Sequence, residues 1–207
     1  MTQKATRRSP RGESRRAEII EAAAEEFAVH GYHGASVAAI AEKVGITQSG
    51  LLHHYPSKEA LMDAVVQSRF ADDLELVTRL TAGETSPFAA YDALVSRNTE
   101  NRTWVQFLMV ITAEGLTADN PAHELIRARY DRVREQMLQR ILLHAGDEFD
   151  IPTWIDRKEI VSLFLAAVDG LQLQWLYDDS IDMRKQIKLL IDLMNRAHGD
   201  QPASPNS

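Results

Sequence analysis

The sequence predicts an all-α protein, in which an N-terminal helix-turn-helix domain of three helices precedes a C-terminal helical bundle. Three observations support this fold class. Apolar residues recur at helical spacing along nearly the whole 207-residue chain. No segment of the sequence shows the strict alternation of apolar and polar residues that a half-buried strand requires. Glycine, proline and capping residues divide the chain into about nine helical segments.

The first two helices are bounded by residues that favour helix ends. Residues 14–30 form one amphipathic segment, and Gly31 suits the position just after a helix end. Ser36 can cap a second helix over residues 37–44, because its hydroxyl can accept a hydrogen bond from a free N–H of the first turn.

A turn and two further caps follow. Gly45 permits a sharp turn, and Thr47 can cap a short third helix that ends near His53. Ser57 can cap a long fourth helix that reaches about residue 80. Two short helices joined by a glycine turn are typical of a helix-turn-helix, and the polar face of the third helix should then point outward.

The rest of the chain should form the bundle. Ser86 and Pro87 predict the start of a fifth helix, since proline is favoured in a first helical turn. Residues 104–116 are apolar almost all round, which predicts a buried central helix. Three more amphipathic segments follow, over residues 120–144, 157–177 and 182–197.

The composition is that of an ordinary globular protein, with 44% hydrophobic and 26% charged residues. The chain has no cysteine, which excludes disulfides, thiolate metal sites and cysteine nucleophiles. No run approaches the roughly 20 apolar residues of a membrane-spanning helix. No apolar stretch of a signal peptide follows the basic N-terminus. We therefore expect a cytoplasmic protein that does not bind a membrane.

The net charge of −7 is distributed unevenly. Residues 1–16 hold six Lys or Arg and one acidic residue, for a charge of +5, whereas residues 17–207 carry −12. A basic arm on an acidic body suits a protein that contacts nucleic acid at one end. A solvated, disordered tail would have the same composition, so the charge alone leaves both interpretations open.

The segment "IIEAAAEEFAVHGYHGASVAAIAEKVGITQSGLLHHYPSKEALMDAV" resembles the TetR family of bacterial transcriptional regulators. The matching positions are Phe27, Gly31, Tyr32, Gly34, Ser36, Val37, Ile40, Ala41, Gly45, Ile46, Thr47, His54, Tyr55, Ser57, Lys58, Glu59 and Leu61. Farther along, "VDGLQLQWLYDDS" is similar to the penultimate helix of family members. One departure is Leu52, where many relatives have a tyrosine that contacts phosphate.

The resemblance implies how the chain is organised. We expect a disordered basic arm, a helix-turn-helix DNA-binding domain, an effector-binding and dimerisation domain that opens with a connecting helix, and a disordered tail. Their ranges are residues 1–13, 14–56, 57–198 (connecting helix 57–80) and 199–207. The family implies a homodimer that binds a palindromic operator in double-stranded DNA.

The third helix should read the DNA bases, and its neighbours should hold the phosphates. The predicted base contacts are Thr47, Gln48, Ser49, Gly50 and His53. An amide such as that of Gln48 can pair with adenine through two hydrogen bonds, and a glycine at position 50 allows close approach to the groove. The predicted phosphate contacts are Ser36, Val37, His54, Tyr55, Ser57, Lys58, Arg15 and Arg16.

The adjacent His53 and His54 could instead suggest a metal site. Successive residues of a helix point about 100° apart, so the pair is poorly placed to chelate. The His-x-x-x-His spacing of helical metal sites is also missing. We expect neither a metal nor another cofactor.

Two further sets of residues belong to the bundle. The last two helices should form a symmetric dimer interface through Ile160, Phe164, Ala167, Val168, Leu171, Ile187, Leu190, Ile191 and Met194. The candidate effector pocket consists of Trp104, Phe107, Ile111, Glu114, Tyr130, Met137, Phe164, Gln172 and Trp175. For each of these residues taken singly, a plain core role is the more common interpretation.

The sequence thus predicts a homodimeric repressor that a small, largely hydrophobic effector releases from its operator. A regulator that activates, or that answers to a protein partner, would have the same sequence features. A helical-bundle enzyme is the remote alternative, and we expect no enzymatic activity, because the Glu-x-x-His pairs of di-metal bundles do not occur.

Overall fold

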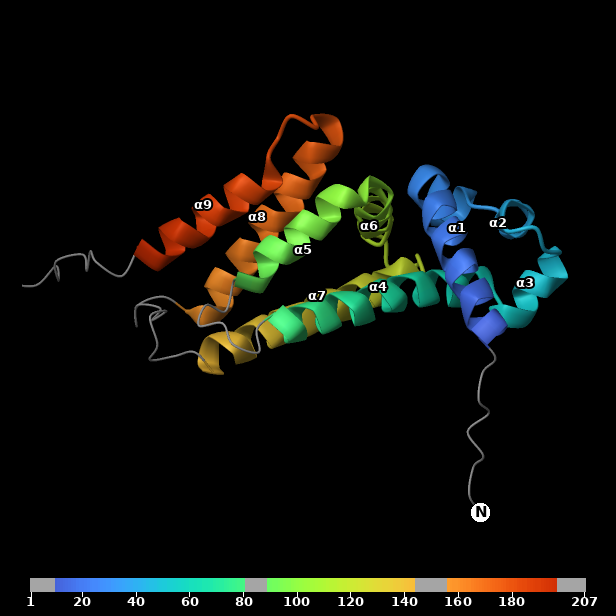
Figure 1. Cartoon of the computed structure of the whole chain (residues 1–207), viewed down its shortest axis with the longest axis horizontal. Coiled ribbons are helices and arrows are strands. Elements are labelled where there is room, and N and C mark those ends of the chain that lie inside the picture. Colours follow the sequence, from blue (N-terminus) through green and yellow to red (C-terminus); the bar gives the residue numbers. More distant parts are fainter. Residues whose placement is uncertain (1–9, 81–88, 144–155, 197–207) are drawn as a thin grey trace, which may run out of the picture. The chain divides into compact units, whose positions relative to one another are not determined.

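The computed structural model describes residues 10–80, 89–143 and 156–196, and every regular element in these ranges is an α-helix (Figure 1). The helices are α1 (Pro10–Gly34), α2 (Val37–Lys43), α3 (Gln48–His54), α4 (Lys58–Leu80), α5 (Ala89–Glu100), α6 (Arg102–Glu114), α7 (Ala122–Leu143), α8 (Arg157–Tyr177) and α9 (Met183–Arg196). The predicted all-α class is confirmed.

The three N-terminal caps form as predicted. The side-chain oxygens of Ser36, Thr47 and Ser57 each accept a hydrogen bond from the backbone N–H three residues later, at 3.3, 3.1 and 3.1 Å. Each cap satisfies one of the N–H groups that a helix start leaves without an intrahelical partner. The sequence therefore locates the starts of α2, α3 and α4 to the residue.

Two glycines have positive φ angles, and both lie at predicted helix ends. Gly45 has φ +69° in the turn between α2 and α3, and Gly31 has φ +66° near the end of α1. Residues with a side chain rarely adopt this conformation. The chain continues helically beyond Gly31, so α1 is a long helix with a kink at this residue.

Some boundaries differ from the predictions or lie outside the described residues. Helix α1 begins at Pro10, inside the segment expected to be a disordered arm. Proline fits a first helical turn because the N–H that it lacks would have no intrahelical partner there. The predicted helix start at Ser86 and Pro87, residues 1–9 of the arm and the tail at 199–207 lie outside the described residues.

The chain divides into two compact units. Unit 1 comprises residues 1–71 and 106–123, and unit 2 comprises residues 72–105 and 124–207. Unit 1 is thus discontinuous, because part of α6 and the following turn belong to it. Its fully buried side chains include Ile19, Phe27, Ile40, Leu51, Leu61, Met62, Phe107 and Ile111.

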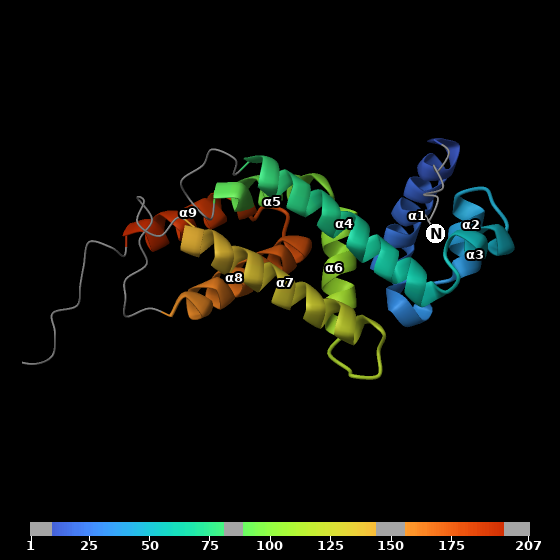
Figure 2. The same ribbon diagram turned by 90° about the horizontal axis from the view of Figure 1, so that it is seen from below.

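In unit 2, α9 packs against both α5 and α8 (Figures 1 and 2). Its buried side chains include Val95, Trp104, Val105, Ile126, Met137, Ile141, Val161, Phe164, Trp175, Met183 and Ile187. Helix α8 is the one described helix whose length and apolar composition would suffice to cross a membrane. Core helices of bundles meet the same criterion, and Phe164 of α8 lies in the unit 2 core.

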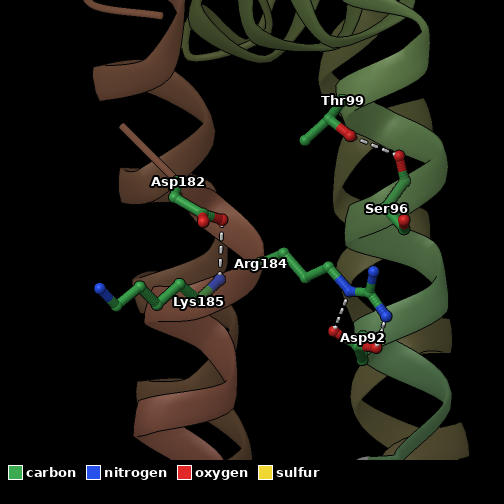
Figure 3. A network of polar contacts seen from close by, with 6 residues as sticks. All are labelled: Asp92, Ser96, Thr99, Asp182, Arg184 and Lys185. Atoms are coloured by element: carbon green, nitrogen blue, oxygen red, sulfur yellow. Dashed lines mark hydrogen bonds and ion pairs between the residues drawn. The ribbon is translucent and has the colours of Figure 1, made fainter. Parts of the chain in front are cut away.

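Polar contacts fix α5 between its neighbours in unit 2. Arg184 of α9 donates through two nitrogens to the carboxylate of Asp92 in α5, at 2.9 and 2.8 Å (Figure 3). At the other end of α5, Arg97 donates to Asp73 and Asp72, at 3.0 and 3.1 Å. Paired guanidinium–carboxylate bonds of the first kind define both distance and orientation.

Candidate nucleic-acid interface and effector site

The start of α3 presents polar side chains to solvent. Thr47, Gln48 and Ser49 are exposed, and the hydroxyls of Thr47 and Ser49 lie 3.0 Å apart. Among the described residues, no hydrogen bond is made by the Gln48 amide, which is therefore available to an external partner. A side chain at Gly50 would come within 3.2 Å of the Thr47 hydroxyl. Four of the five predicted base contacts, residues 47–50, thus lie at the start of α3, whereas His53 lies in its last turn. An accessible helix start is the geometry that direct readout requires.

The end of α3 combines two histidines with an aromatic ring. His53 is exposed, whereas His54 and Tyr55 are partly buried. The two imidazoles lie 6.0 Å apart at 67°, and the Arg16 guanidinium lies 5.9 Å from the centre of the Tyr55 ring. Burial is the main cause that lowers the pKa of His54, and the charges of Arg16, His53 and Arg15 add to it. Within the described part of the chain, no cluster of three His, Asp or Glu residues could hold a metal ion.

Arg15 and Lys58, both predicted phosphate contacts, also hold the domain together. Arg15 donates to the carbonyl of Val44 at 2.8 Å, which ties α1 to the end of α2. Lys58 donates to the carbonyls of His33 and Ala35, at 3.2 and 3.1 Å. Its ammonium also lies 4.8 Å from the centre of the Tyr32 ring. An ammonium has three N–H donors, so one donor of Lys58 remains for a phosphate.

Residues of α6 and the turn after it attach to the end of α1. The Glu114 carboxylate accepts a 2.6 Å hydrogen bond from the backbone N–H of Tyr32. It also lies so close to Gly31 that a Cβ there would be 2.2 Å from its oxygen. The Gln106 amide donates to the Ala28 carbonyl at 3.0 Å. Sequence reasoning missed this attachment, because no local pattern relates residues 82 positions apart.

The residues predicted for the effector pocket are distributed over the two units. Phe107, Ile111 and Glu114 lie in unit 1, where the Phe107 ring packs 6.1 Å from that of Phe27. A helix that is apolar all round can bury different faces along its length, and α6 contributes residues to both units. The members that share unit 2 are Trp104, Tyr130, Met137, Phe164, Gln172 and Trp175.

Within unit 2, two of these pocket candidates carry polar groups, of which Tyr130 is partly buried and Gln172 is buried. The Tyr130 hydroxyl donates to Asp169 at 2.6 Å, and burial together with this bond raises the pKa of Tyr130 to about 12. Gln172 is only 4% exposed, and among the described residues its side-chain oxygen has no hydrogen-bond partner. A buried acceptor without a partner is rare and calls for a bound water or ligand.

The structure buries three of the residues predicted for the dimer interface and leaves the other six partly exposed. Phe164, Ile187 and Ile191 are 1%, 1% and 9% exposed, so they belong to the chain's own core. Ile187 and Ile191 are one helical turn apart on the buried face of α9. The large apolar side chains that α8 and α9 expose are Leu163, Leu173, Tyr177, Leu189 and Leu193. Both faces of α8 are apolar, so the sequence pattern could not distinguish the inner face from the outer one.

Comparison with known proteins relates the chain to one group of regulators. The family model described as "Bacterial regulatory proteins, tetR family" matches residues 19–65. The "HTH-type transcriptional regulator SrpR" of Pseudomonas putida is 28% identical over 84% of this chain and 80% of its own length. The "HTH-type transcriptional repressor KstR2" of Rhodococcus jostii is 30% identical over 52% of this chain and 46% of its own length.

Solved structures share the fold. The crystal structure of FadR from Bacillus subtilis, in complex with stearoyl-CoA, superposes with a TM-score of 0.74. It covers 86% of this chain and 96% of that one, at 14% sequence identity. This likeness concerns the arrangement of helices and by itself says nothing of a shared ligand.

Proposed function

The chain is a DNA-binding transcriptional regulator of the TetR family, and from this premise we propose that it is a homodimeric repressor released from a palindromic operator by a small effector. The exposed polar start of α3 is the observation that carries the DNA-binding part. Bacterial regulators of this kind act in the cytoplasm, which we propose for this chain too.

Base recognition in this proposal belongs to α3, and phosphate recognition to its surroundings. Gln48 is exposed and has no hydrogen-bond partner among the described residues, so it can pair with an adenine edge. The capped starts of α2 and α4 offer free N–H groups and the positive end of a helix dipole to phosphates. Arg16, Lys58 and Tyr55 add cationic or hydroxyl donors nearby. The domain over residues 14–56 thus supplies one half of the interface with a palindrome.

The second copy that a palindrome requires would be held by α8 and α9. Leu163, Tyr177 and Leu193 are 71%, 88% and 57% exposed, which is unusual for large apolar side chains on one pair of helices. A symmetric interface is self-complementary, so the same apolar face on a second chain would cover them. The two recognition helices must then lie about 34–36 Å apart, or one turn of the duplex.

Unit 2 is the proposed effector domain. Its interior combines apolar side chains such as Met137 and Phe164 with the unpartnered oxygen of Gln172. An apolar site with a few directed polar groups is the usual design of a small-molecule pocket. The FadR relative in complex with stearoyl-CoA shows that this fold can hold an amphipathic ligand. Ligand binding would act on DNA only if the ligand prefers one of two conformations.

The test is to select DNA sites from random and genomic fragments with the purified full-length protein, and then to footprint them. We expect a protected inverted repeat, a dimer in light scattering, and weaker protection when a small apolar effector is added. Protection of a single half-site by a monomer would contradict the dimer. Transcription from the bound promoter, measured with and without the protein, separates a repressor from an activator.

A further inference from the structure

A glycine in the middle of α8 is not required by the packing of its own chain. Gly170 lies well inside this helix, and its φ angle is not positive, unlike those of Gly31 and Gly45. A Cβ at Gly170 would meet no described atom within 4 Å beyond the backbone of its own helix. Alanine would fit there and would favour the helix, because glycine destabilises a helix interior. The physical reason that remains for this glycine is a close approach to α8 from outside the chain.

Gly170 is the centre of an outward-facing row of residues, which we call the α8 stripe. The stripe consists of Leu163, Ala166, Gly170, Leu173 and Tyr177, spaced by three and four residues in turn. This spacing places all five on one side of the helix. The four members that have side chains are all exposed. The stripe therefore presents a continuous apolar surface that the described chain does not cover.

The charge of the molecule indicates what covers the α8 stripe. The chain carries a net charge of −7, and none of the five stripe residues is charged. Two acidic copies repel each other, and an uncharged apolar face is where this repulsion is weakest. Burying the exposed leucines and the tyrosine stabilises such a contact. A second copy fits this surface best, because its own stripe needs the same cover.

The sizes of the side chains suit a twofold crossing at Gly170. In an antiparallel crossing centred on this residue, positions at equal distances before and after it face each other. Leu163 lies seven residues before Gly170 and Tyr177 lies seven after it, so these two side chains meet. Leu173 of one copy meets Ala166 of the other, which opposes a large side chain to a small one. At the axis itself, the missing side chain lets the two helix backbones approach.

We propose that two copies of α8 cross in antiparallel orientation at Gly170, on the twofold axis of the dimer. The inference rests on the proposal that the chain is a homodimer, and it adds the point and the orientation of the contact. The glycine then stabilises the dimer at the expense of the single helix.

Cysteine cross-linking tests the crossing point, because the chain has no cysteine of its own. The full-length variants Gly170→Cys, Leu163→Cys and Tyr177→Cys are oxidised with copper phenanthroline and separated on a non-reducing gel. A disulfide requires Cα atoms about 4.4–6.8 Å apart. Gly170→Cys should therefore cross-link two copies. The other two positions each lie about 10 Å along the helix from the axis, on opposite sides in the two copies, and should not cross-link.

The dissociation constant of the dimer gives a second readout. Gly170→Leu should raise this constant at least about 10-fold in analytical ultracentrifugation, because the added side chain overpacks the crossing. Ala128→Leu adds bulk at an exposed position of α7 and is the matched control. The control should leave the dissociation constant within about twofold.

The possible results separate the crossing from the dimer. Cross-linking of Leu163→Cys or Tyr177→Cys that is as complete as that of Gly170→Cys overturns the crossing point. If the protein is a dimer in light scattering, but Gly170→Cys does not cross-link and Gly170→Leu acts no more strongly than Ala128→Leu, the crossing is wrong and the homodimer stands. A monomer at all concentrations refutes the homodimer and the crossing together. Should Gly170→Leu fail to fold by circular dichroism, the cross-linking comparison decides alone.

Discussion

The contact between Glu114 and the end of α1 predicts a measurable coupling between two helices far apart in sequence. Glu114→Ala removes a charge-assisted 2.6 Å hydrogen bond from a part-buried N–H, which should lower the free energy of unfolding by about 2 kcal/mol. Gly31→Ala introduces a side chain at φ +66°, which costs about 1 kcal/mol. It also forces a Cβ to within 2.2 Å of the Glu114 carboxylate, for about 1–2 kcal/mol more.

The double variant has no carboxylate for the new Cβ to strike. Its loss of stability should therefore be about 1–2 kcal/mol smaller than the sum of the two single losses. Urea unfolding followed by circular dichroism gives the three values, at one protein concentration because the stability of a dimer depends on it. Glu135→Ala, at an exposed position of α7, controls for the loss of one negative charge. Additive losses, within about 0.5 kcal/mol, would refute the reasoning.

Three further predictions concern DNA binding, assembly and pH. Gln48→Ala should reduce the binding free energy by about 1–3 kcal/mol only at particular base pairs of the operator. Lys58→Met should weaken binding to all DNA sequences, lower the slope of log affinity against log salt concentration by about 1 and reduce the stability of the protein. A gel-shift series with mutated operators distinguishes the two effects. Leu193→Glu should convert the dimer to a monomer in light scattering, while Leu116→Glu, at an 81% exposed position of unit 1, should not; equal effects would argue against the α8–α9 interface. Because the pKa of Tyr130 is raised to about 12, its contribution to stability is complete below pH 10 and is lost as the pH rises from about 10 to 12. Tyr130→Phe should flatten this part of the curve of stability against pH. An unchanged slope would contradict the assignment.

The local features of the fold could be predicted because their causes lie within a few residues. The side-chain oxygen of a serine or threonine cap accepts a hydrogen bond from the N–H three positions later. Ser36, Thr47 and Ser57 therefore indicate helix starts from the local sequence alone. Gly31 and Gly45 likewise indicate helix ends locally, because both adopt a positive φ angle. The exposed polar start of α3 followed from the same local pattern.

The features that escaped prediction depend on contacts between distant segments. The partner of Glu114 is 82 positions away, and the acceptors of Lys58 are 25 and 23 positions away. No periodicity encodes such pairs. The inner face of α8 was hard to predict for a related reason. Phe164 and Leu163 are adjacent and both apolar, and packing against other helices, such as the contact of Phe164 with Tyr91, decides which one turns inward.

The discontinuity of unit 1 limits how this regulator could be recombined with others. A chimera that joined residues 1–71 to the sensor domain of another protein would lose Phe107, whose ring packs on Phe27. It would also lose Gln106 and Glu114, which bond the end of α1. Exchanging only exposed side chains of α3 such as Gln48, to which we assign base recognition in our proposal, leaves all of these contacts in place. Point substitutions in α3 that change which operator is bound should therefore disturb the contacts within unit 1 less than exchange of a whole domain.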